Sequence, residues 1–303
     1  MQIDSHVAMA GFIVGFTVGL TGMGGGALMT PILVLLFRVQ PLAAVSSDLV
    51  ASVIMKPVGG LVHARRGTVN RALVAWLALG SVPSAFAGVV LLRLLGSGRH
   101  VQDIVQTSLG IALILAAIAI VVKAVINLRR RAAGVEQMPG PPVVRPLPTI
   151  AVGVLGGIVV GMTSVGSGSL IIIMLMLLYP SLRSSQLVGT DLVQAIPLVG
   201  SAALGHVLFG DFRLGLTASL LVGSVPGVYL GARVSASAPG RLIRRALAIV
   251  LLVSGLKLVQ LGTVEVGVIL AVALIAGPVL WRVVRATNGL MLRRVATRGE
   301  AAA

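Results

Sequence analysis

The chain has 303 residues, of which 57% are hydrophobic and 11% charged, and its mean hydropathy is +1.06. This composition excludes a water-soluble globular domain, because apolar stretches of about 20 residues, the length a helix needs to cross a hydrocarbon core, recur along the chain. We therefore expect an all-α polytopic protein embedded in the lipid bilayer. The net charge of +16 is then expected on cytoplasmic loops, and no nucleic-acid partner is expected.

An internal duplication becomes visible when the chain is compared with itself at a shift of about 143 residues. Gly-Ser-Val-Pro at 80–83 recurs at 223–226, and Ser-Asp-Leu-Val at 47–50 corresponds to Thr-Asp-Leu-Val at 190–193. Duplicated units with glycine-interrupted apolar segments at matching places are typical of secondary transporters.

Each half begins with an apolar segment that is too long for one crossing and is interrupted by small residues. Residues 6–37 would form a helix of about 48 Å, and Gly24-Gly25-Gly26 would break it, so we predict a hairpin of two short helices. In the first half, 6–128, this hairpin is followed by spans at about 42–62, 71–95 and 101–128. In the second half, 148–260, a hairpin at 148–179 precedes spans at about 186–208, 213–234 and 241–260. A linker at 129–147, an extra span at 266–284 and a basic tail at 285–303 complete the chain.

The distribution of the 24 Lys and Arg residues predicts the orientation. If each hairpin enters and leaves by the same face, eighteen of them lie on one side of the membrane and five on the other, with Lys56 inside a span. The five are Arg38, Arg93, Arg99, Arg213 and Lys257. The positive-inside rule then places the N-terminus outside and the linker and C-terminus in the cytoplasm. Three crossings per unit make the repeats inverted, so we expect the hairpin tips to approach each other from opposite faces.

The hairpin tips have the features of an anion site. The second short helix of a hairpin presents unpaired N–H groups and the positive end of its dipole, and glycines let a ligand approach that backbone. The glycines are Gly24, Gly25 and Gly26 at the first tip and Gly166 and Gly168 at the second. Further donors would come from the hydroxyls of Thr21, Thr163, Ser164, Ser167 and Ser169. The alternative is that the glycines only permit a tight turn.

Two carboxylates, Asp48 and Asp191, fall within predicted spans at matching repeat positions. Buried carboxylates are costly, so they are candidates for carrying a coupled proton, although both also resemble helix N-caps. Lys56 lies two turns beyond Asp48 and corresponds to Val199 in the other half. It would be either a counter-charge for an anionic substrate or a partner of a carboxylate. His63 and His206, near the ends of spans, are expected to be interfacial polar residues.

The same residues carry a resemblance to a known family. The duplicated glycine-rich hairpin, Ser47-Asp48-Leu49, Val188-Gly189-Thr190-Asp191-Leu192, Lys56-Pro57-Val58-Gly59 and the twin Gly-Ser-Val-Pro segments resemble the sulfite exporter TauE/SafE family. The resemblance covers residues from about 8 to 260. It implies a transporter of the inner membrane for sulfite, a sulfonate or another small organic anion. The first half departs in having Ser46-Ser47-Asp48 where Gly-Thr-Asp or Gly-Thr-Ser is more usual.

Two other functions are compatible with parts of the sequence. A passive anion channel is the nearer alternative, although two buried carboxylates would hinder anion flow. An intramembrane serine hydrolase built on Ser167 and His206 is the other, but the repeat retains His63 while Ser167 corresponds to Gly25. The sequence has no cysteine, metal-binding histidine pair or phosphate loop, so no metal or cofactor is expected. Assembly into a homo-oligomer is left open.

Overall fold

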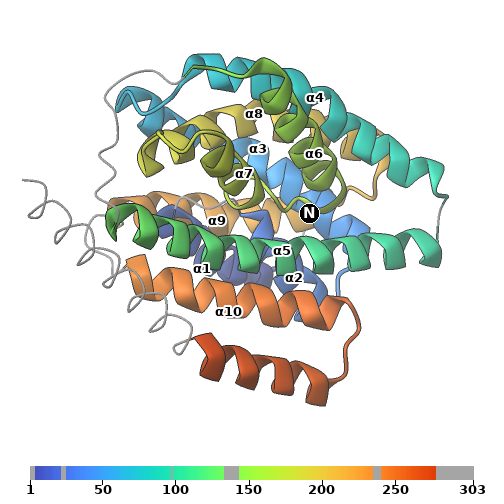
Figure 1. Ribbon diagram of the computed structural model, residues 1–303. Helices are drawn as coiled ribbons and strands as arrows, with labels where there is room; N and C mark the ends of the chain where they lie inside the picture. The colour runs from blue at the N-terminus through green and yellow to red at the C-terminus, as the bar shows by residue number, and fades with distance from the viewer. Residues whose placement is uncertain (1–3, 22–24, 97, 133–142, 235–239, 278–303) are drawn as a thin grey trace, which may run out of the picture.

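The protein is all-helical in the part of the chain that the computed structural model describes, residues 4–21, 25–96, 98–132, 143–234 and 240–277. The helices are α1 Ser5–Thr21, α2 Gly26–Leu35, α3 Pro41–Arg65, α4 Arg71–Leu94, α5 Arg99–Ala132, α6 Pro146–Thr163, α7 Leu170–Leu178, α8 Ser184–Phe209, α9 Leu214–Val234 and α10 Gly240–Leu258 (Figure 1). A further helix, Thr263–Gly277, follows α10. The expected all-α class is thus confirmed.

Five of these helices are long and apolar enough to cross a membrane: Arg71–Leu94, Arg99–Leu128, Pro146–Thr163, Ser184–Phe209 and Leu214–Gly231. By contrast, α2 has 10 residues and α7 has 9, so neither reaches the length of about 20 that a crossing requires. Both interrupted segments are therefore pairs of helices, each with a short second member.

The helices around the linker extend further than we expected. The helix α5 continues past 128 to Ala132, because arginines are good helix formers, and α6 begins at Pro146, where proline is favoured in the first turn. Residues 133–142 of the linker lie outside the described residues, as do residues 278–284 of the extra span and the tail at 285–303.

The first helix of each hairpin packs against the second of the three helices that follow the hairpin in the other half. Contact is through glycines that leave no room for a side chain, so that α1 lies backbone to backbone on α9, and α6 on α4. Corresponding positions of the two halves meet in both contacts: Gly11 with Leu220, Gly15 with Ser224, Gly153 with Leu77, and Gly157 with Ser81. Two halves of the chain related by a two-fold axis would pack in this way. The orientation of the two halves relative to the bilayer stays a prediction.

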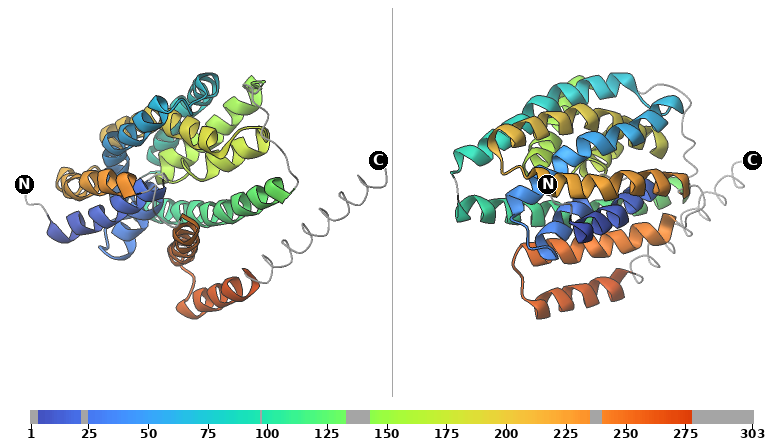
Figure 2. Two further views of the ribbon diagram at one scale, coloured as in Figure 1. Left: turned by 90° about the vertical axis from the view of Figure 1, so that its left-hand side faces the viewer. Right: turned by 180° about the vertical axis from the view of Figure 1, so that it is seen from behind.

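The helices α3 and α8, which follow the two hairpins, pack against each other between these pairs. The helix α5 runs across the molecule with α10 beside it, and Thr263–Gly277 lies beyond α10 at the edge of the molecule (Figures 1 and 2). Because each short hairpin helix also contacts the adjacent α3 or α8, the tips are brought to the middle of the molecule, beside the two predicted carboxylates.

Candidate functional site at the hairpin tips

The second hairpin reverses direction over residues 164–169, between α6 and α7. Three residues of this tip have positive φ: Ser164 at 61°, Gly166 at 138° and Gly168 at 89°. Glycine adopts such conformations without strain. Ser164 is the C-cap of α6, and its left-handed conformation ends that helix. The open end of the hairpin, where α6 begins and α7 ends, is held together by the Tyr179 hydroxyl, which lies 2.6 Å from Thr149 Oγ1. The tip is thus a set conformation in which the N–H groups of Ser164, Val165, Gly168 and Ser169 already donate hydrogen bonds.

The first hairpin tip touches the second. Residues 22–24, including the predicted site residue Gly24, lie outside the described residues, but Gly25 and Gly26 are described and buried. A Cβ on Gly26 would overlap the carbonyl oxygen of Ser164 and would lie 2.6 Å from its Oγ. The glycine therefore permits a close approach between the two tips rather than only a turn.

Asp48 lies at this junction and is fully buried. Its Oδ2 accepts hydrogen bonds from the hydroxyl of Ser164 and from Thr30 Oγ1, the latter at 3.3 Å. Its Oδ1 has no hydrogen-bond partner among the described residues, and a Cβ on Gly25 would lie 3.9 Å from it. The first carboxylate thus joins both hairpins and keeps one acceptor oxygen unused.

Asp191 is also fully buried, and it binds the second tip through the backbone. Its Oδ2 accepts from the Gly168 N–H at 2.6 Å, and its Oδ1 accepts from Gln194 Nε2 at 3.1 Å. The Gln194 side chain in turn accepts from the Ser81 hydroxyl of α4 at 3.1 Å. Both oxygens of this carboxylate are satisfied, so the two aspartates have different surroundings despite their matching repeat positions.

Neither aspartate caps a helix. Asp48 and Asp191 lie 7 residues after Pro41 and Ser184, the first residues of α3 and α8. An N-cap precedes the first helical residue, so that interpretation is wrong. The local sequences Ser46-Ser47-Asp48 and Gly189-Thr190-Asp191 resemble cap motifs, but both lie inside their helices.

Lys56 is buried and connects α3 to the second hairpin. Its Nζ donates a hydrogen bond to Ser167 Oγ. In the described part of the chain it is not within ion-pair distance of either carboxylate, although both are near enough for their charges to act on it. The cluster therefore contains two carboxylates and one ammonium, while Lys123 of α5 acts more weakly on Asp191.

The predicted hydroxyls divide into two groups. Thr21 donates to Thr17 O at 2.8 Å and Thr163 to Val159 O at 2.6 Å, so both bond to their own helices. Ser164 and Ser167 face Asp48 and Lys56, and the buried Ser169 Oγ has no partner among the described residues. Gly166 packs on its own hairpin, where a Cβ would lie 3.1 Å from Val160. The tip serines, Gly168, Lys56 and both aspartates thus form one cluster.

The expectation that His206 is an interfacial polar residue is wrong, because its side chain is fully buried. Its Nε2–H donates to the carbonyl oxygen of Gly161 at 2.7 Å, and its Nδ1 lies 2.8 Å from Ser46 Oγ. Gly161 is in the last turn of α6, where carbonyls lack helical partners, so the imidazole satisfies one of them. The hydrolase pairing of Ser167 with His206 is not formed.

The sequence analysis did not single out four residues that support the cluster: Thr30, Ser46, Gln194 and His206's acceptor Gly161. A signal existed for Gln194, because a glutamine three residues after a buried aspartate lies on the same face of the helix. Thr30 and Ser46 had no comparable signal, since isolated hydroxyls in apolar helices usually bond to the preceding turn.

Comparison with known proteins agrees with the resemblance found in the sequence. The model of the sulfite exporter TauE/SafE family matches residues 7–258. The chain belongs to this family. This TauE/SafE protein is therefore a membrane transporter, and five of its described helices are long and apolar enough to cross the bilayer.

Two similar relatives come from Bacillus subtilis (strain 168). The probable membrane transporter protein YjnA is 40% identical over 254 residues, which are 84% of this chain and 98% of the relative. The probable membrane transporter protein YdhB is 25% identical over 248 residues, 82% of this chain and 96% of that protein. No solved structure matches the chain significantly.

Proposed function

We propose that this TauE/SafE protein is a secondary transporter that binds a small anion at the tip of the second hairpin and moves it together with a proton. The observation that carries the proposal is the meeting of Lys56, Ser167, Asp48 and Asp191 at one buried tip. Ionisable side chains are costly to place inside a membrane, so their presence there favours a functional role.

The anion would be held by the Lys56 ammonium, by the hydroxyls of Ser167 and Ser169, and by the N–H groups of Gly166 and Ser167, which in the described part of the chain are not among the tip N–H groups that already donate hydrogen bonds. Ser169 favours this role because its buried hydroxyl has no partner within the described residues. A site of hydroxyl and N–H donors around one ammonium suits a compact oxyanion. Sulfite, a short sulfonate or a short organic acid has this chemistry, and the family name is consistent with it.

Proton coupling follows from the charges in the cluster. With both aspartates ionised, two negative charges face the Lys56 ammonium, while Lys123 acts only on Asp191, so an anion that enters beside Asp48 would be repelled. Binding of one proton to a carboxylate removes this excess. Asp48 is the better acceptor for it, because Asp48 Oδ1 is unpaired in the described residues whereas both oxygens of Asp191 are bonded. Anion and proton would therefore bind together.

The experiment uses purified protein in lipid vesicles and a panel of labelled sulfite, short sulfonates and short organic acids. Wild-type protein should accumulate one class of anion when a pH gradient is imposed. Asp48→Asn should keep exchange of labelled for unlabelled anion but lose accumulation driven by the gradient, since asparagine hydrogen-bonds without titrating. Asp103→Asn, on an exposed position of α5, is the control and should behave as wild type.

The anion site is tested in the same vesicles. Lys56→Met should raise the KM for the anion, and Ser167→Leu should abolish uptake while the protein remains folded in the membrane. Unchanged uptake by Ser167→Leu would exclude the tip as the site. If Asp48→Asn and Asp191→Asn both respond normally to the gradient, proton coupling is wrong. Flux without any exchange of labelled for unlabelled anion would favour the passive channel.

A further inference from the structure

A second polar region lies away from the hairpin tips, at the end of the helix bundle where α3 and α5 begin and α4 and α8 end. A cavity of about 150 Å³ opens there. An apolar protein cavity of that size holds a molecule such as benzene. Its walls include Leu42, Val89, Phe209, Arg93, Gln102 and Asp211. The cavity is thus apolar on several sides but carries charged and amide groups.

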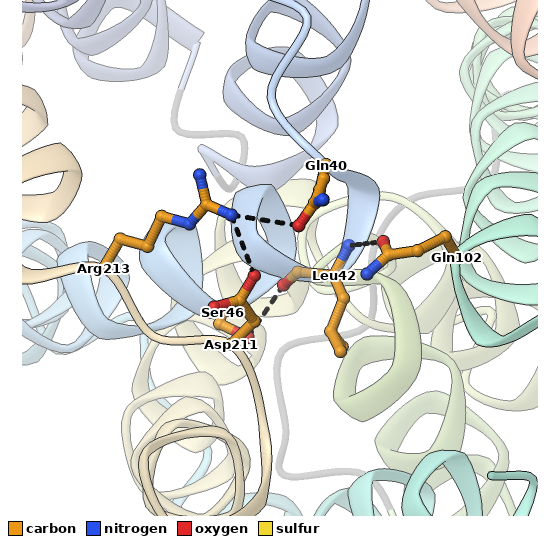
Figure 3. A network of polar contacts seen from close by, with 6 residues as sticks. All are labelled: Gln40, Leu42, Ser46, Gln102, Asp211 and Arg213. Atoms are coloured by element: carbon orange, nitrogen blue, oxygen red, sulfur yellow. Dashed lines mark hydrogen bonds and ion pairs between the residues drawn. The ribbon is translucent and has the colours of Figure 1, made fainter. Parts of the chain in front are cut away.

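The rim of this cavity is fixed by hydrogen bonds, which Figure 3 shows. Arg213 donates to Gln40 Oε1 at 2.9 Å and to Asp211 Oδ2 at 3.2 Å. On the other side, the Leu42 N–H donates to Gln102 Oε1 at 3.0 Å. The negative charge of Asp211 is therefore matched by Arg213, and the oxygen of Gln102 is engaged, which leaves its amide nitrogen as a donor.

Arg93 contributes a positive charge that has no such match. Its guanidinium carbon lies 5.4 Å from the centroid of the Phe209 ring, and Phe209 in turn packs edge-on against Phe86. Among the described residues, no carboxylate or carbonyl accepts a hydrogen bond from Arg93. A guanidinium stacked on an aromatic ring keeps its N–H groups available at the edge, so the exposed Arg93 places a cation without a carboxylate partner among the described residues beside the apolar walls of the cavity.

One wall of the cavity packs against residues that support the hairpin cluster. Gly210 is one of its lining residues, and a Cβ on Gly210 would lie 2.8 Å from Ser46 Oγ and 2.9 Å from His206 Nδ1. The cavity wall therefore rests directly on the pair of residues that joins α3 to the end of α6. Ser46 is two residues before Asp48 on the same helix.

We propose that this cavity is a second binding site, which takes a small organic anion with an apolar body before the anion reaches the hairpin tip. Arg93 and the Gln102 amide would bind the carboxylate or sulfonate group, and Phe209, Val89 and Leu42 would contact the body. The inference rests on the proposed transport function. An anionic lipid headgroup would offer the same charge, so the experiment separates the two sources.

The test compares Arg93→Gln with Arg233→Gln in vesicles of phosphatidylcholine. Arg233 is a matched control, because its guanidinium also stacks on an aromatic ring, Tyr229, at 4.4 Å, but it does not line this cavity. Arg93→Gln should raise the KM for benzenesulfonate about tenfold at an unchanged maximal rate, as expected for the loss of one charge-assisted hydrogen bond. Its effect on sulfite should be smaller, and Arg233→Gln should match wild type.

Equal KM values for the two variants would overturn the proposal. An effect of Arg93→Gln that arises only when phosphatidylglycerol is added would assign the cavity to a lipid headgroup and would also overturn it. Binding of benzenesulfonate to the detergent-solubilised protein, measured by equilibrium dialysis, separates this proposal from the proposed function. Arg93-dependent binding without transport would support the cavity site and contradict the transport of this anion.

Discussion

Replacement of His206 by alanine tests how the end of the second hairpin is held. His206 and His63 occupy the same position in the two halves, but their surroundings differ. His206 is fully buried and bonds to both Gly161 and Ser46. His63 is half-buried, and its ring contacts Thr68 Oγ1 at 2.9 Å. The pair offers the same substitution in two environments within one protein.

The expected magnitudes follow from these contacts. His206→Ala removes two hydrogen bonds of about 1 kcal/mol each, leaves the Gly161 carbonyl unsatisfied and creates a cavity, for a total of about 3–5 kcal/mol. His63→Ala should cost less than about 1 kcal/mol, because water can replace the single bond of a half-exposed ring. Ser46→Ala, which removes one of the two bonds to His206, should fall between them.

The measurement is the free energy of unfolding in mixed detergent micelles, followed by helical circular dichroism as a denaturing detergent is added. Uptake of anion by each variant is measured in parallel, since a displaced α6 would also displace Ser164 and the tip. Equal losses of stability for the two histidine variants would refute the reasoning, because the difference in burial and bonding would then have no energetic consequence.

Two further predictions concern packing and orientation. Gly223→Ala should destabilise the protein by about 1–3 kcal/mol, because the new Cβ would overlap the Ala8 carbonyl oxygen. Gly200→Ala in α8, where nothing lies within 4 Å of the new Cβ, should be neutral or stabilising by up to about 1 kcal/mol. The free energy of unfolding in mixed micelles measures both effects, and equal values would contradict the close packing of α1 on α9. Because the chain has no cysteine, single introduced cysteines can report the orientation of the protein in the membrane. In intact cells a membrane-impermeant thiol reagent should label His100→Cys and should not label Arg66→Cys. The reverse labelling would invalidate the orientation inferred from the charge distribution.

The helices and their approximate bounds could be predicted from the sequence because the signals are local. Apolar runs of membrane length and the glycines that interrupt them determine the backbone only within a few residues of their own positions. The duplication could be predicted for the same reason, since it requires only a comparison of segments. The candidate cluster was predicted in part: Ser164 and Ser167 were expected at a hairpin tip, and the two aspartates were expected inside the spans that follow the hairpins, but the contact of the aspartates with the second tip was not predicted.

The tertiary structure alone decided which of these residues meet. The partner of Lys56 is Ser167, 111 residues away in the sequence, and no periodicity encodes such a contact. The same is true of His206, whose contact with Ser46 spans 160 residues. Repeat symmetry even misleads here, because equivalent aspartates bind the second tip in different ways: Asp48 through a serine hydroxyl and Asp191 through a backbone N–H. A duplicated sequence fixes equivalent helices, but the chemistry of each site depends on side chains that packing brings from the other half.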